Sequence, residues 1–300
     1  MKTAFVFPGQ GSQTVGMGKD LYLRFREEIE PFYRRAQDAL GLDLKALIFY
    51  GPEEKLQFTE YAQPAILLDS MIKFHLLMQQ GSYLPDFGAG HSLGEYSALV
   101  CAGVLSLEDG LILVHKRGRY MQEAVPAGIG AMAAVMKLDY AKVEQICSQT
   151  GAEIANVNSP KQIVISGKRE CVLEAKRLAE AARGAAIELK VSAPFHCSLM
   201  KPAEERLKKD IANTKFAPAS FPVISTVSGE PENDPDRIKE LLMKQITSQV
   251  RWTEYIQNLR ARGVRRFVEV GPGDVLTRLN KRIEKQMEAF SFAEVFTLSA

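Results

Sequence analysis

The chain has 300 residues, of which 46% are hydrophobic and 25% are charged, and its formal net charge is +2. This size and composition are typical of a globular protein that is either one large domain or a domain with an insert. The nearly balanced charge gives no general basis for binding nucleic acid, and no apolar run reaches membrane-spanning length. Neither nucleic acid nor a membrane is therefore an expected partner.

Four cysteines show neither metal-ligand spacing nor a paired pattern: Cys101, Cys147, Cys171 and Cys197. They are expected to be free thiols in a reducing compartment. The apolar start, residues 1–7, is interrupted by Pro8-Gly9 and is too short for a signal peptide. The sequence therefore predicts a cytoplasmic protein.

The first predicted elements are a short strand and a glycine-rich turn. Thr3–Phe7 is an apolar strand, and the turn after it reads Pro8-Gly9-Gln10-Gly11-Ser12-Gln13. The turn matches neither G-x-x-x-x-G-K nor G-x-G-x-x-G, so we do not expect a nucleotide site. Its glycines instead indicate that backbone N–H groups approach another group closely. Helices are predicted over residues 20–40 and 63–79.

The next element is a turn that fits the pattern G-x-S-x-G. Residues 83–87 lead into a short buried strand, Gly90-His91-Ser92-Leu93-Gly94 forms the turn, and an apolar helix follows over residues 95–105. In a nucleophile elbow of this kind, the serine sits on a strained strand-to-helix turn, and the glycines avoid collisions. Ser92 is therefore a candidate nucleophile. The alternative is that these residues form only a tight turn.

A helix predicted over residues 104–121 carries an arginine on its buried side. The residues three and four positions from Arg117 are largely apolar: Leu113, Val114, Tyr120 and Met121. A buried guanidinium is costly unless an anion pairs with it, so Arg117 is a candidate ligand for an anion. A salt bridge to an internal carboxylate, or a side chain that reaches solvent, would explain the pattern equally well.

After residues 126–130 the pattern changes to β-α-β-β-α-β, which is typical of a ferredoxin-like unit. Strands are predicted over residues 131–136, 153–157, 162–166 and 185–191, and helices over residues 139–150 and 170–183. Strands at 222–227 and 266–270, with helices at 236–248 and from Asp274, then resume the alternation of a parallel sheet.

We therefore expect an α/β fold made of two units. The catalytic core is a discontinuous, α/β-hydrolase-like unit with a short parallel sheet, formed by residues 1–127 and 197–300. The insert is a ferredoxin-like (βαββαβ) subdomain, formed by residues 128–196.

A serine nucleophile needs a general base near neutral pH. Among the four histidines, His91 adjoins Ser92 and should point away from its hydroxyl, while His75 and His115 lie within predicted helices. His196 lies where the chain leaves the insert, and loops at such junctions often line a cleft. By elimination, His196 is the predicted base. No acid stands out between Ser92 and His196, which favours a dyad oriented by a carbonyl group over a full triad.

Motifs along nearly the whole chain resemble those of the malonyl-CoA:acyl carrier protein transacylases. They are Phe7-Pro8-Gly9-Gln10-Gly11-Ser12-Gln13, Gln63-Pro64-Ala65, Gly90-His91-Ser92-Leu93-Gly94-Glu95, Arg117, Asn156-Val157-Asn158-Ser159-Pro160, Pro194-Phe195-His196, Val250-Arg251-Trp252 and Gly271-Pro272-Gly273. The resemblance implies transfer of a malonyl group from malonyl-CoA to the phosphopantetheine thiol of an acyl carrier protein. It implies a ping-pong route through an acyl-serine intermediate, with no metal and no cofactor.

The resemblance also implies a role for each matching residue. Ser92 carries the acyl group, His196 acts as base and then as acid, and the backbone N–H groups of Gln10 and Leu93 form an oxyanion hole. Gln245 matches the family position whose carbonyl orients the histidine.

Four further matching residues are expected to bind the substrate: Arg117, Phe195, Asn158 and Gln63. Arg117 would hold the malonyl carboxylate, a bidentate task that suits arginine better than lysine. Phe195 would fill the space that an α-methyl branch needs, which favours malonyl over methylmalonyl.

Two other functions compete with this interpretation. One is an acyl hydrolase, or thioesterase, of the same fold that clears acyl groups from carrier proteins; the other is a non-catalytic docking module for carrier proteins. Arg117 favours the transferase, because a hydrolase of ordinary acyl chains gains nothing from a buried cation. We expect a monomer, with carrier docking assisted by the basic cluster at residues 260–266 or by Lys190.

Overall fold

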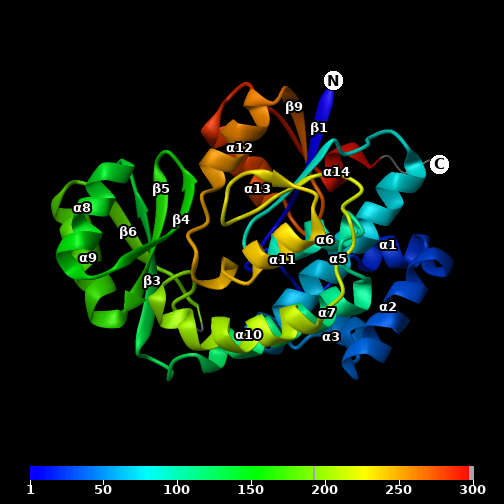
Figure 1. Cartoon of the computed structure of the whole chain (residues 1–300), viewed down its shortest axis with the longest axis horizontal. Coiled ribbons are helices and arrows are strands. Elements are labelled where there is room, and N and C mark those ends of the chain that lie inside the picture. Colours follow the sequence, from blue (N-terminus) through cyan, green and yellow to red (C-terminus); the bar gives the residue numbers. More distant parts are fainter. Residues whose placement is uncertain (192, 297–300) are drawn as a thin grey trace.

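Two separate β-sheets, each packed against helices, make up the α/β structure of this computed structural model (Figure 1). The structure describes residues 1–191 and 193–296. Residue 192, in the predicted insert, and residues 297–300, in the predicted core, lie outside the described residues. Within the described ranges, no helix combines the length and the apolar composition needed to cross a membrane.

The larger unit contains a six-stranded sheet and most of the described helices. Its strands are β1 (Lys2–Phe7), β2 (Phe87–Gly90), β7 (Val223–Ile224), β8 (Pro231–Glu232), β9 (Val264–Glu269) and β10 (Glu288–Ser291). Its helices are α1 (Lys19–Arg24), α2 (Arg26–Leu40), α3 (Leu44–Tyr50), α4 (Glu53–Gln57), α5 (Thr59–Gln80), α6 (Leu93–Cys101), α7 (Leu107–Glu123), η1 (Ser198–Met200), α10 (Lys201–Asn213), α11 (Pro235–Leu242), η2 (Gln245–Thr247), α12 (Trp252–Ala261), α13 (Val275–Ile283) and α14 (Phe292–Val295).

The strand order of this sheet is β10-β9-β1-β2-β7-β8. Neighbouring strands from β10 to β7 run parallel, whereas β8 pairs antiparallel with β7, so the sheet is mixed. The register pairs Phe7 with Gly90, which places the carboxyl ends of β1 and β2 side by side. The glycine-rich turn and the G-x-S-x-G turn therefore meet at the edge where open parallel sheets bind ligands.

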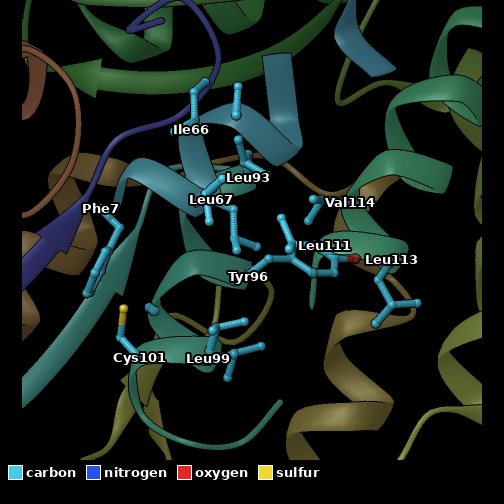
Figure 2. Close-up of a cluster of buried hydrophobic side chains, with 14 of the residues drawn as sticks. Phe7, Ile66, Leu67, Leu93, Tyr96, Leu99, Cys101, Leu111, Leu113 and Val114 are labelled. Atoms are coloured by element: carbon cyan, nitrogen blue, oxygen red, sulfur yellow. The ribbon is translucent and has the colours of Figure 1, made fainter. Parts of the chain in front are cut away.

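The alternation of β1 explains why helices cover both faces of this sheet. Phe5 and Phe7 belong to the core that α5, α6 and α7 cover, and Figure 2 shows Phe7 among side chains of these helices. Ala4 and Val6 point to the opposite face and pack in a second core with Trp252 of α12. A strand buried on both faces is expected to be continuously apolar, as β1 is from Ala4 to Phe7.

The smaller unit lies at one end of the molecule (Figure 1). Its elements are β3 (Gly130–Met136), α8 (Tyr140–Thr150), β4 (Glu153–Ser159), β5 (Gln162–Lys168), α9 (Arg169–Ala181) and β6 (Ala185–Glu188). The sheet is antiparallel with the order β4-β5-β3-β6. Val143 of α8 and Val172 of α9 pack with Ile165 on one face, and Met132 and Val164 line a cavity on the other.

The prediction of an α/β fold with parallel strands and a separate β-α-β-β-α-β unit is confirmed. Some boundaries differ. The helix predicted over residues 104–121 begins only at Leu107, because Ser106 caps it by accepting a hydrogen bond from the N–H of Asp109. The helix predicted over residues 236–248 ends at Leu242, and η2 follows. Strands β8 and β10 were not predicted, because neither Pro-Glu nor Glu-Ala-Phe-Ser is a continuous apolar run.

Replacing Gly90 by alanine should destabilise the protein. A Cβ there would lie 1.9 Å from the carbonyl carbon of Gly94 and 2.0 Å from the nitrogen of Glu95, and these backbone atoms cannot rotate away. Gly41→Ala is the control, because Gly41 has φ 64° but no atom near its missing Cβ, and only a conformational cost of roughly 1–2 kcal/mol applies there. Urea unfolding should show a loss of about 3 kcal/mol or more for Gly90→Ala. Equal losses in the two variants would contradict the steric explanation.

Candidate active site

Ser92 occupies a strained turn between β2 and α6. Its backbone has φ 54° and ψ −106°, in the left-handed half of the map that residues other than glycine rarely adopt. A Cβ on Gly94 would lie 2.0 Å from the carbonyl oxygen of Phe7, so α6 packs directly against the end of β1. The structure thus places Ser92 as the G-x-S-x-G pattern predicts, at the carboxyl edge of the sheet.

His196 faces the Ser92 hydroxyl. Its Nε2 lies 2.6 Å from Ser92 Oγ, and its Nδ1 lies 2.8 Å from the carbonyl oxygen of Ser248. Because a carbonyl only accepts, Nδ1 carries the proton and the Nε2 lone pair is free to accept from Ser92. Burial, and secondarily the positive charge of Arg117, lowers the pKa of His196 to about 3. The imidazole is therefore neutral at neutral pH.

Two backbone carbonyls of one segment act on the His196 ring. The nearer acceptor, at 2.8 Å from Nδ1, is the carbonyl of Ser248, three residues beyond the predicted Gln245, whose backbone also interacts with His196. The 3-10 helix η2 turns the chain so that Ser248 follows it toward the imidazole. The backbone groups of both residues raise the pKa of His196, and the effect of the Ser248 backbone is larger than the effect of the Gln245 backbone. The Gln245 side chain is used elsewhere, against Arg117.

Arg117 projects from α7 into the buried centre of the site and is 1% exposed. Its Nη1 donates to Gln63 Oε1 at 3.0 Å, and its Nη2 donates to Ser92 Oγ at 3.0 Å and to Gln245 Oε1 at 2.9 Å. The guanidinium also lies 5.5 Å from the ring centre of Tyr96. Within the described residues no carboxylate is in direct contact with Arg117, so neither a direct salt bridge nor exposure to solvent accounts for its position.

A cavity of about 500 Å³ opens beside Ser92, between the two units. The larger unit contributes Gln10, Ser92, Leu93 and Arg117, among others. The smaller unit and the segment that leaves it contribute Met132, Asn156, Asn158, Val164, Leu189, Phe195 and His196. A cavity of this size, with apolar walls and a few convergent polar groups, is typical of a small-molecule site.

Two backbone N–H groups beside Ser92 are available to a ligand. Leu93 is the first residue of α6, so its N–H has no acceptor within the helix. The side chain of Gln10 is held by a 3.1 Å hydrogen bond from its Nε2 to Thr59 Oγ1. Within the described part of the chain, neither the Gln10 nor the Leu93 N–H donates to a protein acceptor. Together they can bind an oxygen atom that becomes negative.

Comparison with known proteins agrees with this geometry. The family model described as "Acyl transferase domain" matches residues 4–298. The malonyl CoA-acyl carrier protein transacylase of Escherichia coli (strain K12) is 44% identical over 302 residues, which cover 99% of this chain and 97% of the relative. The chain belongs to the acyl transferase family.

Solved structures of relatives share the fold of this acyltransferase. The malonyl CoA-acyl carrier protein transacylase of Coxiella burnetii matches with a TM-score of 0.95 and 42% identity, covering 97% of this chain and 94% of the other. A type II polyketide synthase acyl carrier protein in complex with its malonyl-transacylase matches with a TM-score of 0.93 and 41% identity, covering 97% and 95%.

The three remaining predicted substrate-binding residues occupy different positions in the acyltransferase. Phe195 and Asn158 line the cavity, and Asn158 Oδ1 lies 2.9 Å from Nε2 of His91, whose ring thus engages Asn158 rather than Ser92. Gln63 lies behind Arg117 and is 1% exposed. Its Oε1 accepts from Arg117, so any effect of Gln63 on a bound acyl group passes through the guanidinium.

The basic cluster at residues 260–266 does not lie at the cavity mouth. Val264 pairs with Lys2 at the start of β1, whereas the cavity lies where β1 ends. Arg260, Arg262 and Arg266 also form ion pairs with glutamates. The prediction that this cluster flanks the cleft is therefore wrong. A cluster of basic residues in the sequence does not indicate at which end of the sheet those residues lie. Lys190 does line the cavity.

Two contributors to the site were missed in the sequence. Tyr96 was not singled out, although it follows the G-x-S-x-G-E motif by one residue and its ring faces Arg117. Ser248 acts through its backbone carbonyl, which carries no residue-type signal. Only the short distance along the chain to Gln245 pointed to that segment.

The pH dependence of acylation should shift when Arg117 is replaced by alanine. Catalysis needs neutral His196, so the rate falls as pH drops through its pKa. The positive charge of Arg117 lowers that pKa, and its removal should therefore raise the pKa of His196 and move the acid limb to higher pH. Burial should still hold the limb below the ordinary value of about 6.5.

The measurement is kcat/KM for acetyl-CoA against pH, because an acetyl group lacks a carboxylate that would need Arg117. Lys190→Ala removes an exposed cation from the cavity wall and is the matched control, whose limb should stay in place. An acid limb that does not move in Arg117→Ala would contradict this electrostatic effect.

Proposed function

We propose that the chain transfers a malonyl group from malonyl-CoA to the phosphopantetheine thiol of an acyl carrier protein. The observation that carries this proposal is the guanidinium of Arg117, buried without a carboxylate partner and 3.0 Å from Ser92 Oγ. An acyl group on Ser92 that ends in a carboxylate would place that anion against the cation. The names of the relatives support the same substrate and the same kind of partner.

The first half-reaction forms the acyl-serine. Ser92 Oγ attacks the thioester carbonyl carbon while His196 Nε2 takes the hydroxyl proton. The N–H groups of Gln10 and Leu93 stabilise the oxyanion, each contributing roughly 2.7–4 kcal/mol in comparable sites. The carbon–sulfur bond then breaks, and His196 returns the proton to the thiolate of coenzyme A.

The second half-reaction repeats these steps with a different thiol. The carrier thiol gives its proton to His196 and attacks the Ser92 ester, and the proton then returns to Ser92 as the serine leaves. Both substrates use one serine in turn, which makes the route ping-pong. No oxidation state changes, and nucleophile, base and oxyanion donors all belong to the chain, so we propose that no cofactor or metal takes part.

Arg117 has a different partner in each stage of the proposed cycle. In the free enzyme its Nη2 donates to Ser92 Oγ. Once Ser92 is acylated, that oxygen is an ester oxygen and a poorer acceptor, so the N–H group is released to the malonyl carboxylate. Charge-assisted bonds from arginine to a carboxylate are roughly twice as strong as neutral ones. Arg117 thereby selects acyl groups that carry an anion.

A finer description of the fold belongs to the same proposal. The larger unit, residues 1–127 and 197–300, is α/β-hydrolase-like, supported by an elbow that follows a parallel strand. The smaller unit, residues 128–196, is ferredoxin-like, supported by its element order and its sheet order. The proposal also includes a cytoplasmic monomer that supplies fatty acid or polyketide synthesis, and the free cysteines accord with a reducing compartment.

Ser92→Ala should abolish acyl-enzyme formation while leaving the fold intact, because Ser92 is the hydroxyl paired with His196. The measurement is intact-protein mass after exposure to labelled malonyl-CoA. Cys197→Ala is the control and should still be labelled, since the Cys197 thiol is buried and burial raises its pKa. Stoichiometric malonylation of Ser92→Ala would rule out this nucleophile.

In the unmodified enzyme, label that moves to carrier protein indicates a transferase, and label released to water indicates a hydrolase.

Replacing Arg117 by alanine should collapse malonyl transfer and leave acetyl transfer unchanged or improved. The malonyl carboxylate would lose its partner, whereas an acetyl group no longer leaves a buried cation unpaired. A buried charge-assisted pair broken from one side typically costs 2–5 kcal/mol, so the malonyl-to-acetyl preference should fall by about tenfold or more. The comparison is kcat/KM for both acyl-CoA donors on one folded preparation. If both activities fall together, Arg117 has only a structural role.

A further inference from the structure

A buried carboxylate lies one amide away from Arg117. Glu95 belongs to the first turn of α6 and is 3% exposed. Its Oε2 accepts from Gln245 Nε2 at 2.9 Å, and Gln245 Oε1 in turn accepts from Arg117 Nη2 at 2.9 Å. Gln245 is fully buried. The anion and the cation are thus joined through a single amide with no water-exposed atom between them.

The amide of Gln245 can lie in only one orientation. Its Nε2 donates both to Glu95 and, at 2.7 Å, to the carbonyl oxygen of Ser92. Both acceptors require N–H groups, so the amide oxygen is left for Arg117. Gln245 therefore separates Glu95 from the guanidinium of Arg117, while its amide forms a hydrogen bond to each of the two charged groups.

The charge of Glu95 acts on the same cation that would hold a substrate carboxylate. Burial raises the pKa of Glu95 above its ordinary value, although Thr226, Gln245 and the positive Arg117 each act in the opposite direction. An ionised Glu95 offsets the cost of burying Arg117 when no substrate is bound. When a substrate carboxylate binds, two anions share one cation, and the attraction for the substrate is weaker than Arg117 alone would give.

We propose that Glu95 sets the strength with which Arg117 selects an anionic acyl group. The Glu95 carboxylate stabilises the empty site and weakens the attraction between Arg117 and the malonyl carboxylate. A weaker attraction helps the malonyl group to leave with the carrier thiol. Glu95 acts through Gln245 and is a specificity-determining residue rather than a catalytic one. This inference rests on the proposed function, because it takes the malonyl carboxylate as the ligand of Arg117.

Two isosteric changes test the anion: one removes it, and the other brings it closer to Arg117. Glu95→Gln removes the charge and keeps a hydrogen-bond acceptor for Gln245. The preference for malonyl over acetyl should rise by about threefold or more, and the KM for malonyl-CoA should fall. The double variant Glu95→Gln/Gln245→Glu keeps one anion but moves it from one amide away into direct contact with Arg117, where the amide introduced at position 95 can donate to it. The same preference should then fall by about tenfold or more.

The matched control is Glu269→Gln. Glu269 is also a fully buried carboxylate, but it accepts the backbone N–H groups of Leu276 and Thr277 at the start of α13 and has no link to Arg117. Its replacement should lower the melting temperature and leave the malonyl-to-acetyl preference unchanged. All variants are assayed at about pH 8, well above the ordinary pKa of a glutamate, with both acyl-CoA donors and after a check of folding by circular dichroism.

The expected order, from strongest to weakest malonyl preference, is Glu95→Gln, then the unmodified enzyme, then Glu95→Gln/Gln245→Glu. An unchanged or lowered preference in folded Glu95→Gln overturns the proposal. If Glu95→Gln does not fold, an unchanged or raised preference in the double variant overturns it instead. Failure of the unmodified enzyme to load malonyl on Ser92 would refute the proposed function itself, whereas normal loading with equal preferences refutes only the role of Glu95.

Discussion

The burial of one positive charge constrains the whole site. Arg117 is 1% exposed, and the groups that touch it are neutral: two glutamine amides, one hydroxyl and one aromatic ring. These groups come from α5, α6 and η2, so three segments far apart in the sequence must converge on α7. A guanidinium in such surroundings costs free energy unless its N–H groups find acceptors. These segments supply acceptors for Nη1 and Nη2, whereas Nε has none within the described residues. The packing of these helices is therefore tied to the position of Arg117.

Both residues proposed to react are among the four described residues other than glycine that have a positive φ. Ser92 has φ 54° and His196 has φ 57°, and both values are costly for residues with a Cβ. Each is held by contacts that lie outside its own segment. Gly94 allows α6 to press against the end of β1, and the Ser248 carbonyl fixes the imidazole. The strain persists because rigid elements on both sides leave these residues no alternative conformation.

The sequence was most informative where a function depends on local spacing. The G-x-S-x-G turn and the apolar neighbours of Arg117 each span only a few residues of the sequence. Both could therefore be located without knowledge of the fold. The contact between His196 and Ser248 joins residues 52 positions apart through a backbone atom, and no residue type encodes it. The break between α11 and η2 was also missed, because apolar residues continue at helical spacing past Leu242. Long-range and backbone-mediated contacts required the tertiary structure.

Exclusion of water leaves the site with a neutral base, His196, beside a charged guanidinium, that of Arg117. Burial disfavours the protonated form of His196 and lowers its pKa, while Arg117, whose intrinsic pKa is far higher, remains charged in the same surroundings. The two groups also interact, since the charge of Arg117 lowers the pKa of His196 further. A carboxylate that binds Arg117 offsets this charge and makes His196 a stronger base. A substrate whose carboxylate binds Arg117 therefore also raises the basicity of His196 toward the value that proton transfer requires.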